Sequence, residues 1–119
     1  MVTPKYHLPE IEVWYVLPAI RRELVFALRG KGLAQKEIAT LLNVTEAAVS
    51  QYLQAKRGRD IFDEPVKKFI HAAAERISDS ETAYSEIQSI NEYVLKTKAL
   101  CQIHMDVEKG LKGCDVCYR

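Results

Sequence analysis

The stretch GLAQKEIATLLNVTEAAVSQYLQAKRG, residues 32–58, contains two short amphipathic segments separated by a tight turn. Apolar side chains recur at helical spacing over residues 35–42, which predicts a short helix with one buried face. The side chains expected on that face are Ile38, Leu41 and Leu42. Asn43 follows, a residue type that tolerates the left-handed backbone of a tight turn. We therefore expect the helix to end there and the chain to reverse sharply.

A second helix is expected to begin directly after this turn, at Thr45. The Thr45 hydroxyl can accept a hydrogen bond from an early backbone N–H, and Glu46 complements the positive end of the helix dipole. Val49 and Leu53 would face inward, and Ala39 is small enough to let the two helices cross closely. Two short helices joined by a turn of about three residues make a helix-turn-helix unit.

The outward face of the second helix carries side chains that suit base recognition. Glutamine can pair with N6 and N7 of adenine in the major groove, serine can donate or accept, and an alanine methyl can contact the thymine methyl. The expected base-facing residues are Glu46, Ala47, Ser50, Gln51 and Gln54. Lys56, Arg57 and Arg59 follow directly, where contacts with phosphates would hold the duplex. For each single side chain, the alternative is an ordinary solvated surface position.

This motif resembles the helix-turn-helix of the phage-repressor-like (XRE-type) transcription regulators. With VWYVLPAIRRELVFALRGKG upstream, it resembles an archaeal branch of that family over residues 10–60, although members often have glycine at the place of Asn43. The resemblance implies that Gln35 contacts a phosphate and that the outward residues of the second helix face bases. The predicted DNA-binding set is Gln35, Thr45, Glu46, Ala47, Ser50, Gln51, Gln54, Lys56 and Arg57.

Helical periodicity continues on both sides of this motif. Upstream, a helix is expected to end at Gly30 and Gly32, because glycine accepts left-handed backbone angles. Its apolar face is Leu17, Ile20, Leu24, Ala27 and Leu28, whereas Arg21 and Arg22 are expected to face solvent. Downstream, Asp63 and Pro65 fit the start of a further helix. Its apolar stripe is Val66, Phe69, Ile70, Ala73 and Ile77.

The last predicted helix follows a capping box expected at Ser78 and Glu81. Its apolar positions alternate in spacing like a short coiled-coil seam. They are Ala83, Ile87, Ile90 and Val94. Because a palindromic operator needs a two-fold symmetric reader, we expect a homodimer built on these two helices. The alternative is that both helices pack onto the helix-turn-helix of their own chain.

The C-terminal stretch CQIHMDVEKGLKGCDVCYR, residues 101–119, contains all three cysteines of the chain. Cys101, His104, Cys114 and Cys117 have the spacing C-x2-H-x9-C-x2-C, two pairs that can each reach one metal centre. A reducing compartment does not maintain structural disulfides, so this clustering favours thiolate ligation. The alternatives are a Cys114–Cys117 redox pair and plain surface thiols. The other histidines, His7 and His71, have no comparable neighbours in the sequence.

Two cofactors suit this donor set. Three thiolates and one imidazole are a common structural zinc site, which would help to order a polar tail. An iron–sulfur cluster can also accept histidine in place of cysteine. We favour the iron–sulfur cluster over Zn²⁺ by a small margin, because a tail beyond the expected dimer helices suits a sensor.

Length and composition limit the remaining choices. At 119 residues, with 48% hydrophobic and 28% charged residues, the chain fits one compact domain with an appendix. Residues 1–60 contain nine Lys or Arg against six Asp or Glu, and residues 61–119 contain eight against ten. The basic half therefore coincides with the predicted DNA-binding motif. The longest apolar run is too short for a membrane span or a secretory signal, so a cytoplasmic protein is expected.

We thus expect an all-α protein with three parts. They are a helix-turn-helix domain over 1–60, a helical dimerisation region over 61–100 and a metal- or cluster-binding tail over 101–119. There is no recognisable catalytic constellation and no small-molecule substrate is identified, so an enzyme is not expected. The expected function is a dimeric, sequence-specific transcription regulator that senses redox state or iron. The alternatives are a non-sensory DNA-binding protein with structural zinc, and a protein-interaction module without specific DNA binding.

Overall fold

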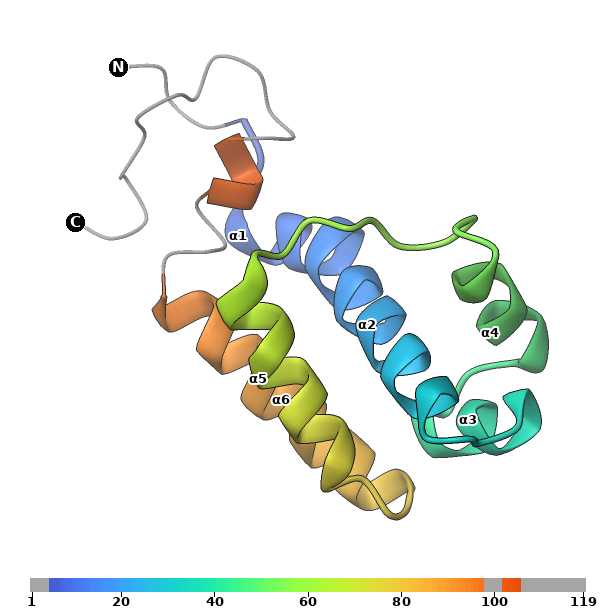
Figure 1. Ribbon diagram of the computed structural model, residues 1–119. Helices are drawn as coiled ribbons and strands as arrows, with labels where there is room; N and C mark the ends of the chain where they lie inside the picture. The colour runs from blue at the N-terminus through green and yellow to red at the C-terminus, as the bar shows by residue number, and fades with distance from the viewer. Residues whose placement is uncertain (1–4, 98–101, 106–119) are drawn as a thin grey trace.

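The computed structural model describes residues 5–97 and 102–105, and these residues form helices and loops without any strand (Figure 1). The order of elements confirms the predicted all-α class. The elements are α1 (Leu8–Ile11), the π-helix η1 (Glu12–Val16), α2 (Leu17–Gly30), α3 (Gln35–Leu42), α4 (Glu46–Leu53), α5 (Glu64–Glu75) and α6 (Ser80–Lys96).

The first three elements form one continuous helix, longer than the periodicity upstream of the motif predicted. The backbone at Ile11 and Leu17, where the segments join, is helical, and the Leu17 N–H donates to the carbonyl of Glu12, five residues back. Proline at position 18 has no N–H, and its ring crowds the carbonyl of the residue four positions earlier. A widened π turn just before Pro18 is one way for a helix to accommodate that crowding.

The helix-turn-helix forms where residues 32–58 predicted it. Helix α3 spans the predicted residues, and Asn43 ends it with left-handed angles of φ 55° and ψ 46°. The Thr45 hydroxyl accepts a hydrogen bond from the Ala48 N–H at 3.0 Å, which caps α4. Upstream, Gly32 has a φ of 94°, so α2 ends in the glycine turn that the sequence indicated. The two short helices pack against each other and against α2.

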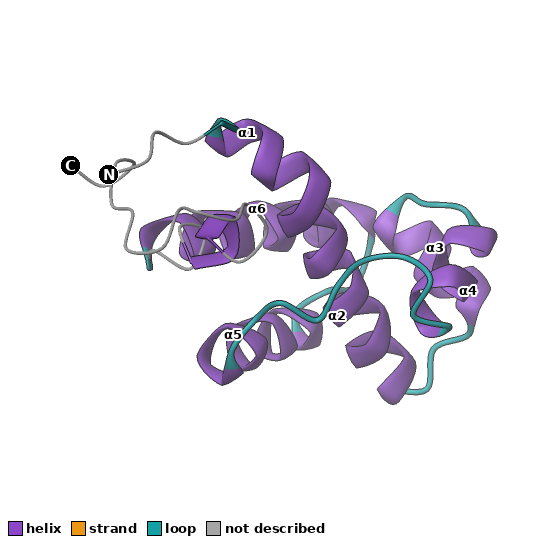
Figure 2. Cartoon of the chain, turned by 90° about the horizontal axis from the view of Figure 1, so that it is seen from above, coloured by secondary structure: helices purple, strands orange, loops and turns teal. Residues whose placement is uncertain are grey.

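Helices α5 and α6 form an antiparallel pair that packs along α2, and α6 also contacts α3 (Figures 1 and 2). Asp63 caps α5 by accepting from the Val66 N–H, as expected. The capping box predicted for Ser78 and Glu81 is wrong by one residue. Asp79 is the cap of α6, and its carboxylate accepts from the Thr82 N–H at 2.7 Å. Thr82 can replace Glu81 as the reciprocal partner because its hydroxyl also accepts from the Asp79 N–H.

The apolar stripes of α5 and α6 are used inside the chain. Ile70, Ala83, Ile90 and Val94 are almost fully buried, and the Phe69 and Tyr93 rings stack at 4.1 Å. Helix α6 contacts α2, α3 and α5, so one hydrophobic core runs across the sequence boundary at residue 60. These side chains therefore pack within their own chain, which was the alternative to a dimer interface. A dimer would need a different surface.

No helix in the described part of the chain is both long enough and apolar enough to cross a membrane.

Candidate nucleic-acid interface

Helix α4 presents the predicted base-facing residues on its accessible side. Thr45, Glu46, Ala47 and Gln54 are exposed, and Ser50 and Gln51 are half-buried. The opposite side faces the core through Ala48, Val49 and Tyr52. Leu53, which was expected to face inward, is only partly buried, whereas Tyr52 is 2% exposed. Tyrosine commonly buries its ring, and Tyr52 takes the inward place that was expected for Leu53.

Two side-chain hydrogen bonds organise the outer surface of α4. Gln54 Nε2 lies 2.8 Å from the Ser50 hydroxyl, one helical turn away. Arg57 Nε donates to Gln51 Oε1 at 2.9 Å, and its guanidinium lies 5.8 Å from the centre of the Tyr52 ring. The last contact falls within the range of a cation–π interaction. Ser50 is thus linked to Gln54, and Gln51 is linked to the basic residue Arg57 beyond the helix.

The basic loop after α4 lies against the long N-terminal helix. Gly58 has a φ of 76°, and a Cβ at this position would lie 2.8 Å from the Pro18 carbonyl oxygen. The guanidinium of Arg59 lies 5.0 Å from the centre of the Tyr15 ring. Lys56 is exposed, like Arg57. These contacts hold the loop beside α4 as it crosses towards α5 (Figure 1).

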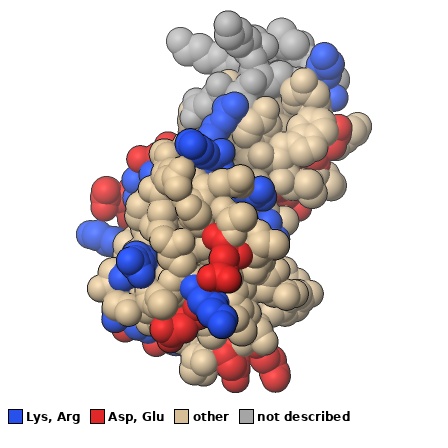
Figure 3. All heavy atoms as spheres, turned by 90° about the vertical axis from the view of Figure 1, so that its right-hand side faces the viewer, with Lys and Arg blue, Asp and Glu red and all other residues tan. Residues whose placement is uncertain are grey.

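The side of the molecule that bears α3 and α4 carries charges of both signs. Figure 3 shows Lys and Arg side chains interspersed with Asp and Glu on this face. Acidic Glu37 and Glu46 lie on the two motif helices, and Lys36 lies beside Gln35 at the start of α3. Gln35 is half-buried at the first position of that helix, where the predicted phosphate contact would form. Binding by this face would therefore depend on placed side chains rather than on a uniformly positive surface.

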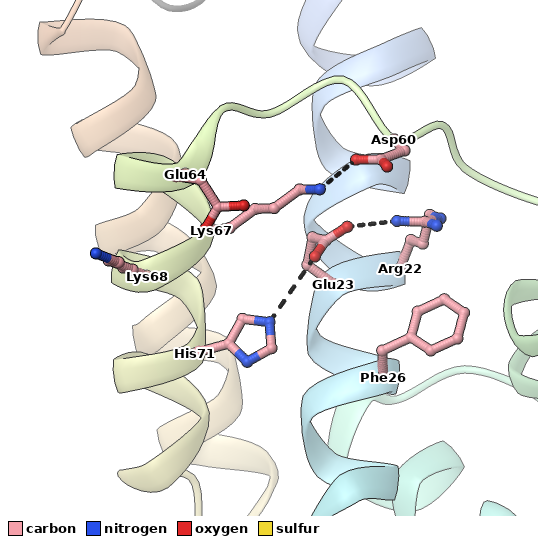
Figure 4. A pocket seen from close by; sticks show the side chains of 8 residues that line it. All are labelled: Arg22, Glu23, Phe26, Asp60, Glu64, Lys67, Lys68 and His71. Carbon is pink, nitrogen blue, oxygen red and sulfur yellow. Dashed lines mark hydrogen bonds and ion pairs between the residues drawn. The ribbon is translucent and has the colours of Figure 1, made fainter.

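A charged pocket lies between α2 and α5, at the end of the basic loop that is closest to α5 (Figure 4). Lys67 Nζ lies 2.6 Å from Asp60 Oδ1, and this hydrogen bond lowers the pKa of Asp60 and raises the pKa of Lys67. Glu23 is 5% exposed, pairs with Arg22, and lies 3.9 Å from His71 Nε2. The sequence does not predict this network, because Arg22 is expected to face solvent and His71 has no comparable neighbours in the sequence. Its members come from three separate segments.

Only one of the four predicted metal ligands belongs to the described residues. His104 lies in a helical turn over residues 102–105 and is 2% exposed. Its neighbour Ile103 is equally buried and lines a pocket with Phe62 and Val66. The other three predicted ligands, Cys101, Cys114 and Cys117, lie outside the described residues. Within residues 5–97 and 102–105, no three His, Cys, Asp or Glu side chains are grouped to hold a metal ion.

The helix-turn-helix segment is similar to one known protein family. Residues 16–57 match the family model described as sigma-70, region 4, a helix-turn-helix DNA-binding fold. The matched segment covers α2, α3, α4 and the start of the basic loop. Comparisons with curated proteins and with solved structures give no match. The prediction of a helix-turn-helix DNA-binding protein with a regulatory role is thereby supported, whereas the XRE type and the archaeal branch stay predictions.

Proposed function

We propose that this protein is a sequence-specific DNA-binding transcription regulator that reads base edges with α4 and holds phosphates with the following loop. The observation that carries this proposal is the outer face of α4. It combines accessible Gln and Ser side chains with a basic loop that Gly58 and Arg59 keep against the N-terminal helix. Side chains that hydrogen-bond to base edges specify a sequence, and phosphate contacts position the protein on the duplex.

Selection of binding sites from a random duplex library, followed by affinity measurement at two salt concentrations, tests this proposal. We expect wild-type protein to enrich a defined site, and the double variant Q51A/Q54A to lose the preference for it while retaining salt-dependent binding. A matched control is Gln88→Ala on α6, an exposed glutamine far from α4 in the sequence. Weak binding that disappears at modest salt and enriches no sequence would instead support a protein-interaction module.

We propose further that the regulator binds a palindromic operator as a homodimer. Two-fold related half-sites favour a two-fold symmetric reader. Because the seam of α6 is buried in the chain, the interface would use exposed apolar side chains, of which Tyr84 on α6 is 69% exposed. Light scattering during size-exclusion chromatography should give twice the monomer mass for wild type and a monomer for Tyr84→Glu. A wild-type monomer at micromolar concentration, with and without DNA, would refute the dimer.

The C-terminal site is proposed as the sensory element. Three thiolates and the His104 imidazole form a donor set that suits an iron–sulfur cluster or Zn²⁺. Burial of His104 beside Ile103, which lines a pocket with Phe62 and Val66, supports the idea, because a ligand anchored there would connect the tail to the core that carries the helix-turn-helix. A bound cluster would supply redox chemistry, and zinc would supply folding energy.

Anaerobic purification followed by absorption spectroscopy and metal analysis of one sample decides between these cofactors. Broad absorption at about 400 nm, with stoichiometric iron and sulfide, would identify an iron–sulfur cluster. One zinc per chain and no colour would identify a structural site. A sensor further requires loaded and metal-free protein to differ in operator affinity by about 5- to 150-fold at fixed salt. Equal affinities would leave the tail a structural role only.

A further inference from the structure

The pair formed by Gln51 and Arg57 changes what α4 can recognise. Arg57 Nε donates to Gln51 Oε1 at 2.9 Å. A guanidinium has donors only, so the Gln51 atom that faces it must be the amide oxygen. This fixes the orientation of the Gln51 side-chain amide. By contrast, the Ser50 hydroxyl beside Gln54 can donate or accept, so that contact does not fix the orientation of the Gln54 amide.

Glutamine reads adenine by using both ends of its amide. The oxygen accepts from the N6 amino group while the Nε2 group donates to N7. In this protein the oxygen is already engaged by Arg57, and the positive guanidinium beside it disfavours the approach of a second donor such as the N6 amino group. The pair instead offers the two Nε2 hydrogens of Gln51 and the remaining N–H groups of Arg57. A set of donors complements the N7 and O6 acceptors of guanine.

Arg57 is held in this position by more than one contact. Its guanidinium lies 5.8 Å from the centre of the Tyr52 ring, and that ring is itself fixed in the core. The backbone on both sides of the residue is also restrained. The Lys56 N–H donates to the Gln51 carbonyl at 2.8 Å, and Gly58 lies against Pro18. These contacts favour the paired arrangement in the free protein, so less order has to be established on binding.

We infer that Arg57 sets the base preference at the position that Gln51 reads, so that the hydrogen-bonded pair selects guanine, whereas Gln51 alone would select adenine. This inference rests on the proposed function, because it concerns the same recognition helix. It differs from the role of Arg57 predicted from the sequence, which was contact with a phosphate. A phosphate contact contributes affinity to every sequence equally, whereas a base-selecting pair changes the preferred sequence.

The test is binding-site selection from a random duplex library with wild type, Arg57→Ala and Lys56→Ala. For Arg57→Ala we expect the preferred base at one position to change from guanine to adenine, with the ratio of the two affinities shifting by at least about fivefold. Lys56→Ala is the matched control, because it removes one positive charge from the same loop and leaves the pair intact. It should weaken binding uniformly and lower the salt slope by about one. Far-ultraviolet circular dichroism checks that each variant stays folded.

A double variant separates the pair from its members. In the Gln51→Ala background, Arg57→Ala should produce no adenine preference, because the side chain that would read adenine is absent. An adenine preference in this double variant would overturn the inference. So would an unchanged selected sequence with uniformly weaker binding of Arg57→Ala, which would make Arg57 a phosphate contact while leaving the proposed function intact. If wild-type protein selects no sequence, the proposed function fails and the inference fails with it.

Discussion

Thr45 and Asn43 determine the geometry of the turn that presents α4. Asn43 supplies the left-handed backbone, and the Thr45 hydroxyl satisfies the Ala48 N–H. Loss of a cap hydroxyl costs about 1 kcal/mol, so Thr45→Ala should lower the free energy of unfolding by that amount, measured by urea denaturation. Thr40→Ala is the matched control, because its hydroxyl bonds to the Lys36 carbonyl inside α3 and caps nothing. Equal losses for the two variants would contradict the capping role.

Gly58 is the residue at which the basic loop approaches the N-terminal helix most closely. Alanine there would combine a left-handed backbone with a Cβ 2.8 Å from the Pro18 oxygen. We expect Gly58→Ala to lower the free energy of unfolding by about 2 kcal/mol and to weaken DNA binding, because the loop must move away. Gly30→Ala should instead be neutral or stabilising by up to about 1 kcal/mol, since no atom lies within 4 Å of the added Cβ. Thermal unfolding and DNA titration of both variants provide the comparison.

At the scale of elements, the sequence predicted the ends and caps of helices better than it predicted the contacts between them. Residues 35–42 form α3 as expected because apolar spacing, the Asn43 turn and the Thr45 cap are all encoded within a few neighbouring residues. The π-helix before Pro18 was missed because the apolar pattern is compatible with either helix type. Tyr52 was not assigned to the inward face, although its spacing of three residues from inward Val49 fits that face. The set of DNA-binding residues stays a prediction, and no sequence signal pointed to the Gln51–Arg57 contact.

The cap of α6 can be tested directly against the box that the sequence predicted. Asp79 accepts hydrogen bonds from Thr82, whereas the Ser78 backbone N–H, not its hydroxyl, takes part in the observed turn. We expect Asp79→Ala to lower the midpoint of urea denaturation and Ser78→Ala to leave it nearly unchanged. The reverse order of effects would show that the box begins at Ser78.

The charge of Asp79 should also give the stability of α6 a pH dependence. Hydrogen bonds from Thr82 lower the pKa of Asp79 in the folded protein below its ordinary value. A lowered folded-state pKa stabilises the fold above the unfolded pKa of about 3.9, and this contribution is lost as pH falls through the folded pKa. Asp79→Asn keeps a capping side chain without the titrating proton. Wild type should therefore exceed this variant in stability at pH 7, and the difference should disappear in acid; a difference independent of pH would contradict the assignment.

At the scale of the whole molecule, the hydrophobic stripes of α5 and α6 were predicted, but their partners were not. Periodicity shows which face of a helix is apolar and does not show whether a second chain or the same chain covers it. In the structure, α6 packs on α2 and α3, so the core joins residues 1–60 to residues 61–97. Helix α6 thereby packs against the helices that also contact α4. A conformational change in α6 can therefore affect α4 through the core that they share.

This arrangement predicts that the helix-turn-helix and the α5–α6 pair unfold together. Ile90 is fully buried on α6, so Ile90→Ala should lower the free energy of unfolding by about 2 to 5 kcal/mol, whereas exposed Gln88→Ala should change it little. Trp14 is the single tryptophan of the chain and lies in η1, outside both helix pairs. Its fluorescence reports the unfolding of the long N-terminal helix, and far-ultraviolet circular dichroism reports the loss of all helices. If the protein unfolds as one unit, the two signals should show one coincident transition, shifted equally by Ile90→Ala. If the two probes separate and DNA binding survives the loss of α6 structure, residues 1–60 form an independent domain, and coupling between the tail and α4 would require a route other than the core.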